Sequence, residues 1–487
     1  MKRLIEKIIS LRLKRFYKME LTKLSIKEAH EKLVKKEITV CELVDAYLKN
    51  INEKNDSINA YLTIFDDLDE QISVAQEKID SGNSDLLTGI PIAVKDVIQL
   101  KGKRATGGSK ILENYVSPYD ATVISKLRAF SPVFLGKTNT DEFAQGGSTE
   151  FSAYGVTKNP HDEERVAGGS SGGSAAAVSA EMALVALGSD TGGSIREPAG
   201  FCGIVGLKPT YGAVSRHGLM AMASSFDCIG PMTKNTEDAE IVFNAIKGKD
   251  EFDSTTIEGE NSSDVKTIGV PVNFLKEGID PDVLDNFNNQ IEKLKTLGYE
   301  IKEIDIPTLE YALSVYYVLV PAEVSSNMAR FDGVKYGSKI DGDNLLETYL
   351  NTRGELLGTE VKRRIMLGTY ILSAGYSDQF YNKAWQVRTK IKEDVNKVFE
   401  DVDLIALPVA PTPAFKIGEN EDDLLKNYLI DIFTVVANVT GMPGIALKGG
   451  FVEREGKSVP TGFQLFAPHL FENRLFEVGK KFETIES

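Results

Sequence analysis

The sequence predicts an α/β fold in which a single large mixed β-sheet is covered by helices on both faces. Two observations favour this architecture. Short apolar runs of strand length alternate with segments of helical periodicity, and the 487 residues show no internal repeat. Hydrophobic residues make up 42% of the chain, which is enough for a large core, while the apolar runs are too short to cross a membrane.

The elements of the first half are predicted from the spacing of their apolar residues. Residues 22–80 have helical spacing, with one face formed by Leu43, Tyr47, Leu48 and Ile51. Apolar runs of strand length follow at Ile90–Ile98, Val133–Lys137, Met182–Gly188 and Asp227–Thr233. Glu237–Ile246 again has helical spacing, so a helix is expected to close this half.

The second half continues the alternation after a polar segment, Lys249–Asp264, that is expected at the surface. From Val283 to Leu297 apolar residues recur at helical spacing, and Gly298 is a natural stop for that helix. Further strands are predicted at Thr267–Val272, Leu404–Val409, Gly444–Leu447 and Gly462–Phe466. Further helices are predicted at Tyr311–Phe331, Gly358–Phe399 and Asp422–Val439.

Two clusters rich in glycine and serine and one lysine indicate the chemistry. The clusters are GGSSGGS at 168–174 and DTGGSIR at 190–196, and Lys95 lies in the apolar run IAVKDVI at 92–98. Glycines let backbone N–H groups approach a reacting carbonyl, and such groups stabilise a tetrahedral oxyanion. A lysine in apolar surroundings has a lowered pKa and can act as a base. Taken singly, the clusters also fit flexible loops and the lysine fits an edge strand.

The position of Ser194 adds weight to the catalytic interpretation. Met182–Gly188 is predicted to be a buried strand that runs into the second cluster, so Ser194 is expected just past the carboxyl end of a strand. Ligands of open α/β sheets bind at that edge.

Other catalytic and nucleotide-binding motifs fit less well. Gly169-x-Ser171-x-Gly173 satisfies the nucleophile-elbow pattern, but the polar stretch 158–165 before it predicts no strand, and only His217 or His469 could follow as a base. Neither cluster ends in the Gly-Lys-Ser/Thr of a phosphate loop. Ser263-x-x-Lys266 has a penicillin-binding-protein spacing within a polar stretch and is interpreted as chance.

Composition excludes several classes of protein. Three unclustered cysteines argue against a disulfide framework or a cysteine zinc site, and no metal site is predicted. A net charge of −15 argues against a broad nucleic-acid surface on this chain. The basic segment 1–20 is predicted to be an exposed N-terminal extension, or the product of a translation start placed too early. A signal peptide is not expected. The alternative interpretation is a basic arm that touches RNA or a partner.

Three consecutive segments carry a family resemblance: GGSSGGSAAAV at 168–178, GSDTGGSIREPA at 188–199 and GFCGIVGLKPTYG at 200–212. Together they resemble the signature of the amidase signature family. The resemblance implies the amidase signature fold, with residues 21–487 as one domain. It also implies a Ser–Ser–Lys triad in which Ser194 is the nucleophile, Ser170 is a bridging serine with an unusual cis peptide, and Lys95 is the base. The backbone N–H groups of Thr191, Gly192 and Gly193, with that of Ser194, would form the oxyanion hole.

Within that family the chain is most similar to the glutamine-hydrolysing A subunits of tRNA-dependent amidotransferases, on segments 137–150, 325–333 and 360–368. This resemblance implies that Arg364 grips the α-carboxylate of glutamine, that Asp431 binds its α-ammonium group and that Tyr316 lines the pocket. A guanidinium suits a carboxylate, and a carboxylate suits an ammonium group. Arg363 is the competitor for the carboxylate, and Arg364 could instead pair with a neighbouring acid.

The same resemblance implies partners and a location. Ammonia would pass to a B subunit that holds ATP, Mg²⁺ and the misacylated tRNA, while a small C subunit joins the two. This chain would need no cofactor of its own, would meet tRNA only through the B subunit, and would be cytoplasmic, without membrane contact. A stand-alone amidase of small carboxamides remains open, because it would share the triad without needing Arg364 and Asp431. A non-catalytic scaffold is disfavoured by the intact triad.

Overall fold

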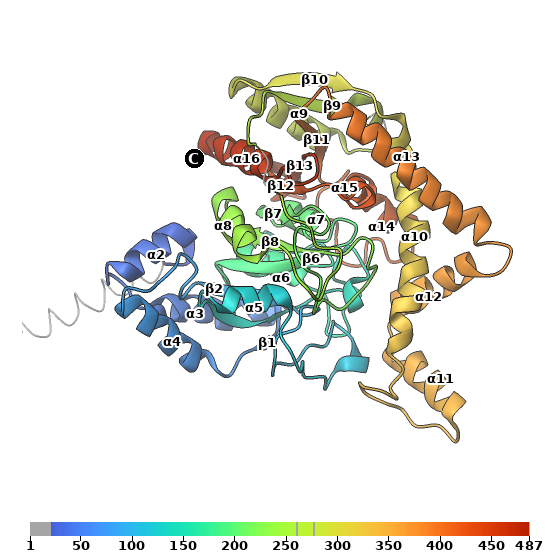
Figure 1. The fold of residues 1–487 in the computed structure, drawn as a ribbon, viewed down its shortest axis with the longest axis horizontal. Helices are drawn as coiled ribbons and strands as arrows, with labels where there is room; N and C mark the ends of the chain where they lie inside the picture. Colours follow the sequence, from blue (N-terminus) through green and yellow to red (C-terminus); the bar gives the residue numbers. More distant parts are fainter. Residues whose placement is uncertain (1–20, 260–261, 276–277, 487) are drawn as a thin grey trace, which may run out of the picture.

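The computed structural model describes residues 21–259, 262–275 and 278–486 (Figure 1). In this part of the chain the main sheet has eleven strands, in the order β1-β3-β2-β6-β8-β7-β12-β13-β11-β9-β10. The strands are β1 Tyr61–Ile64, β2 Pro91–Lys95, β3 Val133–Thr138, β6 Val185–Asp190, β7 Val205–Lys208, β8 Cys228–Thr233, β9 Thr267–Pro271, β10 Glu300–Ile304, β11 Leu404–Pro408, β12 Gly444–Arg454 and β13 Lys457–Phe466. The predicted extension 1–20 lies outside the described residues.

The sheet is mixed, as predicted. β2 pairs in parallel with β3 and β6, and β9 pairs in parallel with β10 and β11, whereas β6 pairs antiparallel with β8. Every residue of β2, β3, β6, β7, β8 and β11 is buried. Because successive side chains of a strand point to opposite faces, burial of all of them means that both faces of the central sheet are covered. The predicted α/β architecture is therefore confirmed.

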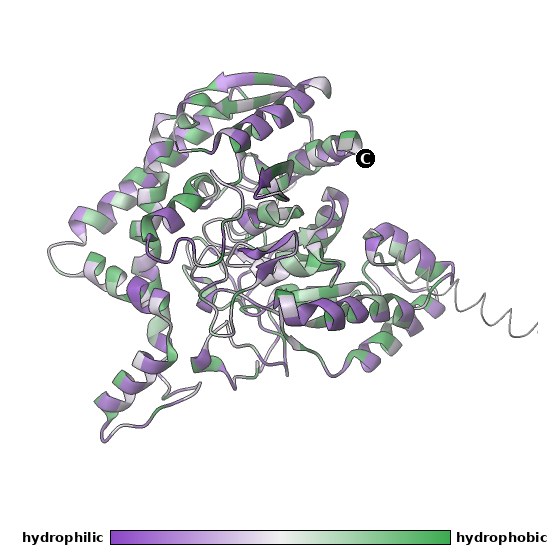
Figure 2. Cartoon of the chain, turned by 180° about the vertical axis from the view of Figure 1, so that it is seen from behind, coloured by the Kyte–Doolittle hydropathy of each residue, from purple (hydrophilic) through white to green (hydrophobic). Residues whose placement is uncertain are grey.

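The α-helices of the described residues are α2 Ile26–Val34, α3 Val40–Ile58, α4 Leu68–Asp80, α5 Thr122–Arg128, α6 Gly172–Ser179, α7 Arg196–Phe201, α8 Thr236–Ile246, α9 Pro281–Thr296, α10 Ala312–Asn327, α11 Leu345–Leu356, α12 Thr359–Leu372, α13 Lys383–Val398, α14 Leu424–Leu429, α15 Val435–Thr440 and α16 Glu472–Glu486. Many of them pack against this sheet, whereas α10, α11 and α12 stand to one side of it and contact other helices (Figure 1). Peripheral helices carry hydrophilic and hydrophobic residues side by side (Figure 2), as amphipathic helices do. None of the described helices is long and apolar enough to span a bilayer.

Local sequence explains where several helices begin. Ser25 and Thr39 each accept a hydrogen bond from the backbone of a glutamate three residues later, and that glutamate reaches back to the cap, so capping boxes start α2 and α3. The apolar helix α10 packs against α12, α13 and α15. This helix group carries one part of the candidate site, and the loops of the central sheet carry the other.

Several elements differ from the sequence prediction. The predicted helical region 22–80 also contains β1, and the strands β7 and β10 were not predicted; β10 lies at the sheet edge with two exposed glutamates, so it lacks an apolar run. The predicted helix 358–399 is divided into α12, a π-helical turn at Asp378–Asn382 and α13, and α11 was not predicted. The expectation of no strand before the first cluster is wrong, because β4 Lys158–Asn159 and β5 Asp162–Val166 form a hairpin there, separate from the main sheet.

Candidate active site

Lys95 ends β2 and is completely buried. Its Nζ lies 2.7 Å from Ser170 Oγ, 2.8 Å from Ser171 Oγ and 2.9 Å from Ser189 Oγ. Burial lowers the pKa of Lys95 to about 7, even though Asp141 and Asp190 act in the opposite direction. The side chain thus has the surroundings that the apolar run around it predicts, and a large neutral fraction near pH 7.

The hydroxyl hydrogen of Ser171 fixes the direction of the hydrogen bond between Ser171 and Lys95. Ser171 Oγ donates its one hydrogen to the carbonyl oxygen of Ser189 at 3.0 Å, so it accepts from Lys95. A neutral amine has two N–H donors and one lone pair. One N–H of Lys95 is therefore directed at Ser171, while its second N–H and its lone pair face the hydroxyl groups of Ser170 and Ser189. The contact of 2.7 Å between Lys95 Nζ and Ser170 Oγ is short enough for proton transfer between these two residues.

Ser170 follows a cis peptide bond, Gly169–Ser170, and lies just before α6. The backbone N–H of Gly169 donates to Glu197 Oε2 at 2.8 Å, and a Cβ on Gly169 would lie 2.3 Å from Asp141 Oδ2. No side chain larger than hydrogen fits at residue 169, because the loop that begins at Asp141 packs directly against it. Burial raises the pKa of Glu197 well above its usual value.

Ser194 lies just past the carboxyl end of β6 and is 8% exposed, as its sequence position predicts. In the described part of the chain its Oγ makes no hydrogen bond, and none joins it to Ser170. The backbone N–H groups of residues 191–194 likewise have no acceptor among the described residues. Because buried N–H groups are almost always bonded, a run of four without acceptors among the described residues has the donors that a negatively charged oxygen requires.

A buried ion pair holds the turn that carries Ser194. Arg196 Nη2 and Asp190 Oδ1 are 3.1 Å apart, both side chains are fully buried, and Asp190 Oδ2 accepts from the backbone N–H of Ile195 at 3.2 Å. Burial alone would raise the pKa of Asp190, but the charge and hydrogen bond of Arg196, the charge of Lys208 and the hydrogen bond from Asn438 together lower that pKa. On the other side of the turn, Thr191 Oγ1 donates to Asp227 Oδ1 at 2.7 Å.

A small cavity beside these loops contains Arg364 and Asp431 among its lining residues. Arg364 Nε donates to Glu360 Oε1 at 2.7 Å, and Asp431 accepts from Tyr317 Oη at 2.9 Å. Burial raises the pKa of Asp431 to about 7. Arg364 is therefore paired with an acid on its own helix, as the alternative interpretation allows. Its Nη1 and Nη2 make no hydrogen bond to the described residues and can still receive a carboxylate.

Tyr316 and Arg363 occupy different surroundings from those expected. Tyr316 is buried against the second cluster, where a Cβ on Gly192 would lie 2.4 Å from its Oη, while the adjacent Tyr317 lines the cavity. Arg363 also contacts Glu360. The structure adds Ser189 and Asp227, which sequence patterns did not single out because their partners lie far away in the chain, and it gives Ser171, considered above only for a nucleophile elbow, a contact with Lys95.

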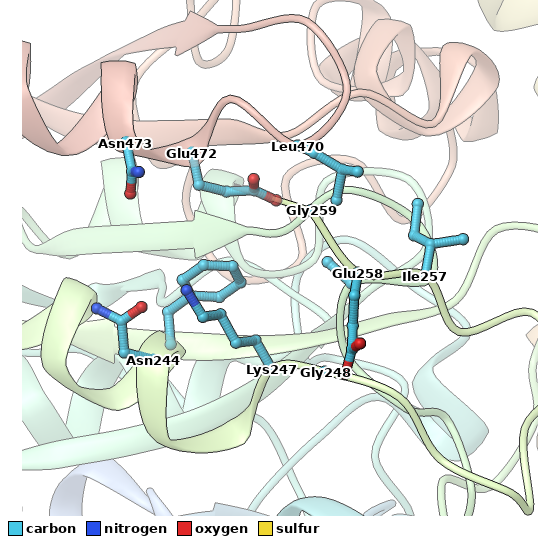
Figure 3. A pocket seen from close by; sticks show the side chains of 11 residues that line it. Asn244, Lys247, Gly248, Ile257, Glu258, Gly259, Leu470, Glu472 and Asn473 are labelled. Atoms are coloured by element: carbon cyan, nitrogen blue, oxygen red, sulfur yellow. The ribbon is translucent and has the colours of Figure 1, made fainter. Parts of the chain in front are cut away.

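A second cavity lies apart from these residues, between α8 and the start of α16 (Figure 3). Phe243, Lys247, Glu258 and Leu470 line it, and it includes none of the residues predicted for the site. No group of histidine, cysteine, aspartate and glutamate side chains in the described part of the chain could hold a metal ion.

Known families and proteins match this chain over most of its length. The Amidase family model matches residues 42–476. The A subunit of the glutamyl-tRNA(Gln) amidotransferase of Thermodesulfovibrio yellowstonii is 50% identical over 475 residues, which are 96% of this chain and 98% of that protein. The A subunit of the glutamyl-tRNA(Gln) amidotransferase of Microcystis aeruginosa is 50% identical over 470 residues, which are 94% of this chain and 97% of that protein.

Solved structures agree with these matches. The crystal structure of the glutamyl-tRNA(Gln) amidotransferase A subunit from Thermotoga maritima is 39% identical and superposes with a TM-score of 0.75 over 96% of this chain and 94% of that one. A bacterial aryl acylamidase, 21% identical with a TM-score of 0.81 over 95% and 96% of the two chains, shares the fold. The chain belongs to the amidase family and, within it, to the family of glutamyl-tRNA(Gln) amidotransferase A subunits.

Proposed function

We propose that this chain hydrolyses glutamine as the A subunit of a glutamyl-tRNA(Gln) amidotransferase and releases ammonia for the amidation of Glu-tRNA(Gln). The observation that carries the proposal is the contact of a buried lysine with Ser170, together with a cavity lined by Arg364 and two acidic side chains, of which Glu360 pairs with Arg364 and Asp431 does not. A free amino acid needs both charges, whereas a simple amide needs neither. Identities of about 50% over nearly the full chain support the same activity.

The mechanism begins with neutral Lys95 as the base. Lys95 accepts the proton of Ser170, which takes the proton of Ser194 as Ser194 Oγ attacks the side-chain amide of glutamine. The N–H groups of Thr191, Gly192 and Gly193, with that of Ser194, stabilise the oxyanion. The protons then return along the same residues to the departing ammonia, and water hydrolyses the glutamyl ester. Ser194 must move to donate to Ser170, or substrate must orient it, because that bond is not formed in this structure.

Substrate recognition is assigned to the charged cavity. Arg364 would bind the α-carboxylate of glutamine through its two terminal nitrogens, and Asp431 would bind the α-ammonium group. Tyr316 would support the pocket through its contact with Gly192 of the second cluster. Tyr317 orients Asp431 by donating a hydrogen bond from its hydroxyl group. Asp431 must be ionised for this role, and binding of an ammonium group beside it favours the ionised form.

The remaining assignments rest on the relatives. The partners would be a B subunit with ATP, Mg²⁺ and the charged tRNA, and a C subunit that joins the two. The protein would be cytoplasmic, and residues 21–487 would act as one domain with 1–20 as an extension. The stand-alone amidase of small carboxamides is the weaker alternative, since it gives no role to Arg364 and Asp431.

The test compares glutamine with neutral amides. Ammonia release is measured for glutamine and for a panel of simple carboxamides, for this chain alone and with its B and C subunits. Arg364→Ala and Asp431→Ala should each lower kcat/KM for glutamine by more than about tenfold relative to any turnover of a neutral amide, since each leaves a charge of the bound amino acid unpaired. Equal losses on both kinds of substrate would favour the stand-alone amidase.

A further inference from the structure

The turn Thr191–Ser194 needs an external support, because its N–H groups bond nothing in the described part of the chain. Gly193 has a φ of +142°, and a Cβ there would lie 2.3 Å from Thr434 Oγ1. The hydrogen bonds of the turn are made through carbonyl oxygens instead, since Gly193 O accepts from the backbone N–H of Glu197 at 2.8 Å and Ser194 O accepts from that of Ser171 at 3.2 Å. Groups that contact its carbonyl oxygens therefore decide where its N–H groups point.

Thr434 supplies such a contact. This residue directly precedes α15, is fully buried, and its Oγ1 donates to the carbonyl oxygen of Gly192 at 2.7 Å. A second contact of the same Oγ1, to the carbonyl oxygen of Asp431, is longer at 3.2 Å. A hydroxyl group has one hydrogen, so the shorter contact is its main hydrogen bond.

The peptide bond between Gly192 and Gly193 is planar and trans. In such a unit the C=O and the following N–H point in opposite directions. Thr434 holds the Gly192 C=O toward α15, and the N–H of Gly193 consequently points away from α15. We propose that Thr434 is a positioning residue for the oxyanion hole, which acts by fixing the orientation of the Gly193 N–H through the Gly192 carbonyl. The inference rests on the proposed hydrolytic function.

The backbone of Thr434 connects this support to the rest of the site. Its N–H donates to the carbonyl oxygen of Asp431 at 3.1 Å, and its carbonyl oxygen accepts from Arg196 Nη1 at 2.9 Å. Arg196 is the partner of Asp190 at the start of the same turn. Thr434 therefore connects the backbone of Asp431, whose carboxylate is assigned to the substrate ammonium, with the turn whose N–H groups are assigned to the oxyanion. Its hydroxyl group contacts the turn more closely than it contacts Asp431, so loss of that hydroxyl group should affect the oxyanion donors more than the bound substrate.

The experiment uses two variants of Thr434 and a matched control in the assembled enzyme. Thr434→Val removes the hydroxyl group at nearly constant volume, and Thr434→Ser keeps it. Thr440→Val makes the same change at the last residue of α15, at a buried hydroxyl that donates to Val436 O at 2.8 Å and does not touch the turn. kcat and KM for glutamine, the pH profile of kcat and the melting temperature are measured for all three.

Thr434→Val should lower kcat by about tenfold or more with KM changed by less than about twofold, because a misdirected oxyanion donor weakens only transition-state binding. Thr434→Ser should restore most of kcat, Thr440→Val should leave it near wild type, and the pH profile should keep its shape because Lys95 is untouched. A kcat for Thr434→Val equal to that of Thr440→Val, or a loss seen only in KM, would overturn the inference. A wild type that hydrolyses neutral amides and not glutamine would refute the proposed substrate, and the same comparison would then be made on the neutral amide.

Discussion

The role of Lys95 as a neutral base has a quantitative consequence for the pH dependence of turnover. With a pKa of about 7, about a tenth of Lys95 is neutral at pH 6 and about nine tenths at pH 8. Because the neutral form is the active one, kcat for glutamine should rise about tenfold from pH 6 to a plateau above pH 8. An exposed lysine with its usual pKa near 10.5 would still be gaining activity above pH 9.

Substitution of Lys95 separates the base from the rest of the site. Lys95→Met removes the proton acceptor and should lower kcat by about two to four orders of magnitude. Lys95→Arg should not restore activity, because a guanidinium group stays protonated at every pH of interest and the fully buried site has no room for a longer side chain.

The assay measures ammonia release at saturating glutamine between pH 5.5 and 9.5. Under these conditions kcat reports the ionisation of groups in the enzyme–substrate complex. In that complex the substrate ammonium group keeps Asp431 ionised, so Asp431 does not contribute to the pH profile. Lys234→Met is the matched control, because burial lowers the pKa of Lys234 to about 8 while its Nζ contacts Thr22, outside the site. That variant should keep the wild-type profile. A wild-type plateau reached only above pH 9, or substantial activity in Lys95→Arg, would refute the reasoning.

Three further outcomes are expected. Ser194→Ala should abolish ammonia release. Ser174→Ala should keep it, because Ser174 Oγ donates to Leu187 O at 3.0 Å inside the fold. A glutamyl adduct found by mass spectrometry on any serine other than Ser194 would contradict the assignment. Arg196→Met should lower the free energy of unfolding by about 3–5 kcal/mol, because it leaves buried Asp190 without its partner, and denaturant titration that shows no loss would mean the pair is dispensable. Tyr317→Phe should raise KM for glutamine by a few-fold through loss of the hydrogen bond to Asp431, whereas Tyr381→Phe, a partly buried tyrosine that packs edge-on against Trp385, should leave KM unchanged.

Several elements that sequence patterns missed have a weak local signal, whereas β7 is fully buried but only four residues long. β10 was missed because an edge strand buries only part of its surface and carries exposed glutamates, so no apolar run marks it. The hairpin of β4 and β5 was missed for a similar reason, since its central Glu163 and Glu164 are exposed. The long helix predicted over 358–399 ends instead at Leu372, and the turn that follows contains Gly375 with a φ of +87°, a conformation that favours glycine.

Local patterns in the sequence were enough to predict the class of fold and most strands of the central sheet, because buried strands form apolar runs. Lys95, Ser170 and Ser194 were identified as a candidate triad through a family resemblance. The surroundings of these residues depend on tertiary packing. Ser171 and Ser189 contact the amino group of Lys95 beside Ser170, and Thr434 reaches the turn of Ser194 from a segment more than 200 residues later. Such contacts join side chains that are distant along the chain and common in composition, so their geometry arises from packing and has no signature in the order of residues.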